Sequence, residues 1–132
     1  MESLSEIISI TGSVMQRYGD RILFAYIFGS AATGELQPLS DIDIAVYVSP
    51  GGGETYFDLK LALHAELCRA LRRDDIDLIV LNTAQNIILL DEVVRHGAVL
   101  HDRDPEAREI FELKVLHDAI DFKGQRLAVL GV

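Results

Sequence analysis

Two aspartates, Asp41 and Asp43, are the residues of this sequence whose type and spacing most directly suggest chemistry. They stand at the start of an Ile- and Val-rich run, residues 42–48, which is expected to form a buried strand. Side chains two residues apart on a strand point to the same face, so the two carboxylates should project together. Carboxylates held this close repel one another unless a cation lies between them, and such oxygen-rich sites suit Mg²⁺ with substrate phosphates.

A second feature, Gly29-Ser30, directly follows another apolar run, residues 22–28, which is also expected to be a strand. A strand that ends in Gly-Ser before the helix-compatible Ala31-Ala32 should make a tight turn with free backbone N–H groups. Such a turn binds phosphate oxygens, and the Ser30 hydroxyl adds one more donor. A phosphate-binding turn beside a carboxylate pair outlines a site for a nucleoside triphosphate.

The spacing of these two features resembles a known family. Gly29-Ser30, ten residues and then Asp41-x-Asp43 resembles the signature of the nucleotidyltransferase superfamily related to DNA polymerase β. The surrounding residues look like its minimal nucleotidyltransferase (MNT) branch, with Thr33 where that branch often has an arginine. The resemblance implies an α/β fold in which a mixed β-sheet is flanked by helices and followed by a C-terminal helix. It also implies that Gly29 and Ser30 bind the nucleotide and that ATP is the substrate.

A third carboxylate, Asp77, interrupts the apolar run 76–81, which is expected to form another strand. An unpaired aspartate is costly to bury, so Asp77 either faces water on an edge strand or hairpin, or points into the cleft of Asp41 and Asp43. In the resembled superfamily a third carboxylate on a later strand completes the metal site. The resemblance therefore implies two Mg²⁺ ions held by the three aspartates, with Asp77 as the best candidate for the general base.

Hydrophobic periodicity predicts the elements that position these residues. The expected helices cover residues 3–18, 55–71, 82–96 and about 105–122, with a short turn of helix over 30–34 and a short edge strand over 98–101. Tyr56 is expected to share the buried face of the second helix with four leucines. The last helix carries more apolar residues than one narrow stripe holds, so it is either buried broadly or offers a face to another chain.

Capping and glycine signals set the expected boundaries of the later helices. Asn82 or Thr83 should cap the third helix, and Gly97 should end it. Asp104, followed by a proline, should cap the last helix, and Gly124 should end it. The four histidines have no spacing that suggests a metal site, so they are expected to be solvated or capping residues. Cys68 is expected to be a small core residue.

Composition limits the class of protein. A chain of 132 residues is expected to form a single domain. Its longest apolar runs are about seven residues, too short to span a bilayer, and its acidic N-terminus lacks the basic region of a signal peptide. These features predict a cytoplasmic protein with no membrane partner. A net charge of -9 weighs against direct nucleic-acid binding and favours a small substrate or a protein partner.

The C-terminal third extends the resemblance to MNT antitoxins that accompany HEPN-domain toxins. The residues that carry it are Gly97 to Asp104, Phe111-Glu112 and Asp121-Phe122, with Ala119 in place of a common aromatic residue. It implies an antitoxin that transfers AMP from ATP to a tyrosine of a HEPN ribonuclease toxin. Two alternatives stay open: a small-molecule nucleotidyltransferase of the aminoglycoside type, and a non-catalytic antitoxin that masks its toxin. Whether the chain forms homo- or hetero-oligomers also stays open.

Overall fold

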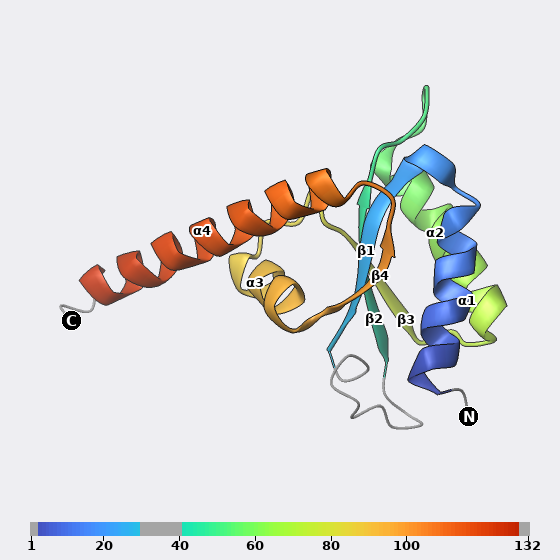
Figure 1. Ribbon diagram of the computed structural model, residues 1–132, viewed down its shortest axis with the longest axis horizontal. Coiled ribbons are helices and arrows are strands. Elements are labelled where there is room, and N and C mark those ends of the chain that lie inside the picture. Colours follow the sequence, from blue (N-terminus) through green and yellow to red (C-terminus); the bar gives the residue numbers. More distant parts are fainter. Residues whose placement is uncertain (1–2, 30–40, 130–132) are drawn as a thin grey trace.

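Four strands form one mixed sheet in the computed structural model, which describes residues 3–29 and 41–129 (Figure 1). The sheet order is β3-β2-β1-β4, so β3 and β4 are its edges. β1 pairs antiparallel with β2 and β4, and β2 pairs parallel with β3. The strands are β1 (Ile22–Phe28), β2 (Ile42–Val48), β3 (Ile76–Val80) and β4 (Ala98–Asp102). The mixed sheet, the pairing of the first two strands and the short edge strand are confirmed.

Helices cover both faces of this sheet. The helices α1 (Leu4–Gln16) and α2 (Tyr56–Leu71) lie on one face, and α3 (Ile87–His96) and α4 (Pro105–Val129) lie on the other (Figure 1). A 3-10 turn, η1 (Gly19–Arg21), joins α1 to β1. Alternate side chains of each strand enter the two apolar layers, which explains why the strands are almost continuously apolar. The α/β class with a C-terminal helix is confirmed; within the two described ranges, no helix is long and apolar enough to cross a bilayer.

The start of α3 differs from the sequence-based prediction. Asn82 does not cap a helix: its side chain accepts a hydrogen bond from the Val48 N–H (2.9 Å) and donates one to the Val48 carbonyl (2.8 Å). The cap is Asn86, whose side-chain oxygen accepts from the backbone N–H groups of Ile88 and Leu89. The prediction of Asn82 or Thr83 was wrong because a side chain that extends strand pairing has the same polar character as a helix cap. Gly97 does end α3.

The predicted end of α4 was also wrong. The helix begins as predicted, because the Asp104 carboxylate accepts a hydrogen bond from the Ala107 N–H (3.1 Å). It continues through Gly124 to Val129. Gly124 does not adopt the positive φ of a helix-ending glycine. The helix therefore continues through it, at the cost of the low helix propensity of glycine.

A partly buried polar network attaches the first half of α4 to the sheet. The Tyr26 hydroxyl on β1 donates to Glu112 on α4 (2.6 Å), and burial together with this bond raises the pKa of Tyr26 so that it stays a donor. Arg108 bridges Glu112 (3.2 Å) and Asp102 of β4 (2.9 Å). Each charged group therefore has a partner, which offsets its desolvation.

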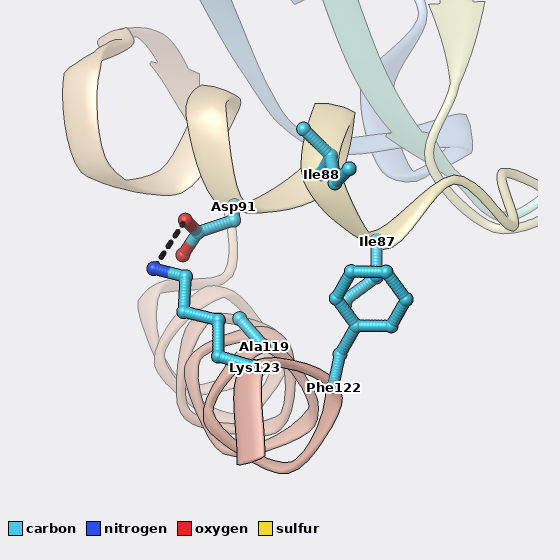
Figure 2. A pocket seen from close by; sticks show the side chains of 6 residues that line it. All are labelled: Ile87, Ile88, Asp91, Ala119, Phe122 and Lys123. Atoms are coloured by element: carbon cyan, nitrogen blue, oxygen red, sulfur yellow. Dashed lines mark ion pairs between the residues drawn. The ribbon is translucent and has the colours of Figure 1, made fainter. Parts of the chain in front are cut away.

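The second half of α4 extends away from the sheet, and its far end runs beyond α3 (Figure 1). Figure 2 shows Ala119 and Phe122 of α4 facing Ile87 of α3, with Lys123 paired to Asp91 (3.8 Å). These side chains line a small cleft of about 180 Å³. The inner side of α4 is thereby in contact with the rest of the fold along much of its length.

Three smaller predictions need correction. Tyr56 is 42% exposed, because α2 begins at this residue and the groove beside it, which Ile79 also lines, stays open. His64 and His101 are neither solvated nor capping; their imidazoles lie against the carbonyls of Ile76 (2.9 Å) and Ile22 (3.3 Å). Burial lowers the pKa of His101. A ring that bonds to a neighbouring strand leaves no pattern in the sequence.

The continuous α4 helix predicts that Gly124→Ala stabilises the protein. No atom within 4 Å would meet the new Cβ, and replacing a helical glycine by alanine gains about 0.5–1 kcal/mol locally. Far-ultraviolet circular dichroism and amide hydrogen exchange of α4 should show increased helicity and protection. Gly53→Ala is the matched control, because Gly53 has open space but a positive φ and should lose stability. A loss of helicity in Gly124→Ala would mean that the helix ends there.

Candidate functional site

The parallel pairing of β2 and β3 places two of the three aspartates side by side. Asp43 and Asp77 are direct partners in the register, close to the N-terminal ends of their strands, and Asp41 directly precedes β2. Ile42 and Ile76 point into the α1–α2 layer, so the side chains of Asp43 and Asp77 point to the opposite face, on the α3–α4 side. Both interpretations of Asp77 therefore hold in part: it is exposed on an edge strand, and it shares a face with Asp43.

Gly29 lies directly against this carboxylate group. Its φ is +73°, which disfavours side chains, and an added Cβ would collide with the Asp43 Oδ2 atom. The preceding residue, Phe28, is the register partner of Asp43 across the β1–β2 pair. The structure thus brings Gly29 and Asp43 together, as the sequence analysis expected. Ser30, Thr33 and the predicted helical turn over 30–34 lie outside the described residues, so the proposed role of Ser30 stays a prediction.

An arginine that the sequence analysis did not single out stabilises the entry to β3. Arg73 donates two hydrogen bonds to the Asp75 carboxylate (2.7 and 2.6 Å), and these bonds lower the pKa of Asp75. The Asp75 carbonyl in turn accepts from the Ile42 N–H (3.0 Å), next to both Asp41 and Asp43. This chain of contacts fixes the start of β3 against the start of β2. The only signal in the sequence was an arginine two residues before an aspartate.

The electrostatics of the site reflect the closeness of the three carboxylates. Burial raises the pKa of the Asp43 carboxyl, and the negative charges of Asp77 and Asp41 raise it further. A divalent cation would relieve this repulsion. Over residues 3–29 and 41–129 no group of three or more acidic, histidine or cysteine side chains is placed so that it could hold a metal ion, and this includes the three aspartates. Their carboxylates are nevertheless the hard oxygen donors that Mg²⁺ prefers, and that ion usually completes its shell with water and substrate phosphates.

Two grooves elsewhere on the protein are not lined by any of the three aspartates. The cleft between α3 and α4 is lined by apolar side chains and one ion pair (Figure 2). A larger groove of about 420 Å³ lies between α2 and the C-terminal end of β3, away from Asp77 at its N-terminal end. The convergence of acidic groups, rather than cavity size, therefore identifies the candidate site.

Residues 10–106 match the family model described as polymerase beta nucleotidyltransferase. This chain belongs to the polymerase β nucleotidyltransferase family. The matched range contains Gly29, Asp41, Asp43 and Asp77, so the resemblance noted in the sequence is confirmed. The domain is accordingly that of a nucleotidyltransferase.

Solved structures share this fold over nearly the whole chain. A toxin–antitoxin complex with AMP-PNP is 25% identical, covers 94% of this chain and 95% of its own, and has a TM-score of 0.75. The MntA–HepT toxin–antitoxin structure (23% identical, TM-score 0.69) covers 96% of each chain. A complex of MNT antitoxin with tri-AMPylated HEPN toxin from Shewanella oneidensis is 23% identical, with a TM-score of 0.71 and coverage of 97% and 96%. Among curated proteins, none matches the sequence.

The contact between Gly29 and Asp43 predicts that Gly29→Ala abolishes function at the site. The new Cβ would displace the Asp43 carboxylate, and the positive φ would cost about 1 kcal/mol in stability. Isothermal titration with Mg²⁺ and a non-hydrolysable ATP analogue should show a loss of binding larger than this stability change explains. Gly19→Ala is the control, since Gly19 has a similar φ but no atom near its Cβ. Equal binding by both variants would contradict the proposed contact.

The raised pKa of Asp43 predicts a pH dependence of stability. Folding makes ionisation of Asp43 less favourable, so its contribution to the free energy of unfolding is present below its unfolded pKa, about 4, and is lost as the pH rises through the folded pKa. Without metal, Asp43→Asn should therefore melt a few degrees above the wild type at neutral pH, and the difference should vanish in acid. Adding Mg²⁺ should stabilise the wild type and not the variant. Asp118→Asn, an exposed carboxylate on α4, is the control; the same behaviour in both variants would contradict the assignment.

Proposed function

We propose that this protein is the antitoxin of a toxin–antitoxin pair and that it transfers AMP from ATP to a tyrosine of a HEPN-domain ribonuclease toxin. One observation carries the proposal: the fold matches, over 94% of the chain, a toxin–antitoxin structure that contains AMP-PNP. The S. oneidensis relative, whose toxin is tri-AMPylated, supports AMP as the transferred group. The proposed unit is a single domain that comprises all 132 residues.

The three aspartates have distinct roles in this proposal. Asp41 and Asp43 would hold one Mg²⁺ ion, and Asp77 would share in holding a second. When bound, the two ions neutralise charge on the triphosphate and lower the pKa of the acceptor hydroxyl. Gly29 leaves room for the β- and γ-phosphates to approach the backbone, and Ser30 would donate a hydrogen bond to them.

The reaction is an in-line displacement at the α-phosphorus of ATP. The tyrosine oxygen forms a bond to this phosphorus, the bond to the bridging oxygen of the β-phosphate breaks, and pyrophosphate leaves. The tyrosine proton passes to the Asp77 carboxylate, which is exposed on the outer strand and so accessible to a large acceptor. Most of the rate enhancement would come from positioning and charge neutralisation.

The acidic surface supports a protein acceptor. With a net charge of -9, the chain should repel an RNA backbone and attract a basic RNA-cutting enzyme. The two alternatives remain outcomes of the test: a small hydroxyl compound as the acceptor, or a masking antitoxin without transfer.

The decisive experiment is the intact mass of a candidate HEPN-domain partner toxin after incubation with this protein, ATP and Mg²⁺. We expect a gain of one or more AMP units on the toxin. Asp77→Asn should slow the transfer about a hundredfold or more, because it removes the proposed base. Asp74→Asn is the matched control, an exposed aspartate three residues earlier that should leave transfer unchanged. A stable complex without mass gain would favour masking, and neither complex nor mass gain would favour a small acceptor.

A further inference from the structure

Helix α4 carries a second apolar face that the fold does not use. Its inner side packs on the sheet and α3 through Val115 and Ala119, which are buried. On the opposite side, Leu113 and Ile120 are 69% and 63% exposed; Ile110 is 61% exposed at the edge of a groove that Tyr47 and Leu81 also line. Large aliphatic side chains this exposed, on one helix face, are a feature of interaction surfaces. We call Ile110, Leu113, His117 and Ile120 the outer stripe.

The spacing of the outer stripe fits another helix. Its residues are separated by three, four and three positions, so they form one continuous seam along the helix. Neither apolar cluster of the core includes any of them. The half of α4 that carries Ile120 extends beyond the sheet (Figure 1), which leaves this side accessible to a partner.

The charges beside the outer stripe are mainly acidic. Three exposed carboxylates of α4 lie beside it, Glu106, Glu109 and Asp121, while Asp118 lines the groove that Phe111 and Val115 also line. The exposed cations beside them are Lys114 and Lys123, and Lys123 is turned inward to Asp91. The His117 Nδ1 atom lies 3.5 Å from the Asp121 carboxylate. The surface is therefore apolar at its centre and negative at its rim, which favours a basic amphipathic helix.

We infer that the outer stripe of α4 is the docking surface for the toxin, which presents an amphipathic helix with basic residues along its apolar ridge. The inference rests on the proposed function for the identity of the partner. Leu113 and Ile120 lie on the side of α4 opposite the buried Val115 and Ala119, whereas Asp43 and Asp77 lie near the N-terminal ends of β2 and β3. Docking and nucleotide transfer thus depend on separate groups of residues and can be disrupted one at a time.

The test measures toxin binding by variants of the outer stripe. In titration calorimetry against the toxin, the double substitution Leu113→Asp and Ile120→Asp should lower the affinity about tenfold or more, as expected for the loss of two central apolar anchors. The melting temperature and the binding of Mg²⁺ with an ATP analogue should be unchanged, because both side chains are exposed in the free protein. Leu61→Asp is the matched control, since Leu61 is 58% exposed on α2, across the sheet from α4, and should bind toxin like the wild type.

The salt dependence of toxin binding tests charge complementarity separately. Wild-type affinity should fall with salt, and Glu109→Gln with Asp121→Asn should reduce that dependence. If the wild type and the double aspartate variant bind the toxin equally well, the outer stripe is not the docking surface, and the proposed function stands. If the wild type forms no complex with the toxin, both are overturned. A dimer of the wild type alone that the aspartate substitutions dissociate, seen by sedimentation, would assign the outer stripe to a second copy instead.

Discussion

Repulsion among three neighbouring carboxylates is the constraint on which this structure depends. Asp43 and Asp77 are held opposite one another because their strands are paired in parallel, and burial of the intervening isoleucines and leucines makes that register the stable one. A slip of one residue would place the aspartates among apolar side chains. Burial raises the pKa of Asp43 most, the charges of Asp77 and Asp41 raise it further, and a divalent cation would relieve that repulsion.

Other contacts around the site preserve this arrangement. Gly29 lets the end of β1 approach Asp43, and the Arg73–Asp75 pair fixes the loop from which β3 begins. Each contact joins segments that are distant in the sequence but adjacent at one end of the sheet. The same principle operates in α4, where Tyr26 and Glu112 attach the first half of the helix to the sheet and Ala119 and Phe122 lie beside α3. Chemistry and partner binding can therefore reside on different parts of one small fold.

The strands could be predicted from the sequence because a strand covered on both faces is apolar almost throughout. The helix boundaries were less predictable, because local signals are ambiguous. Asn82 has the side chain of a helix cap but bonds to Val48, and Gly124 has no side chain yet remains helical. In both cases the outcome depended on which segments lie nearby in space. The burial of His64 and His101 was not predictable for the same reason.

The sequence by itself determined the family: Gly29-Ser30, the Asp41-x-Asp43 pair and Asp77 on an apolar strand are local patterns that resemble its signature, and the family model matches residues 10–106. It also left two environments open for Asp77, edge strand or shared cleft. Only the tertiary structure showed that the edge strand β3 is the neighbour of the strand that carries Asp43, because β2 and β3 pair in parallel. It alone also decided which apolar face of α4 is buried, since periodicity marks a face as apolar but cannot say what covers it.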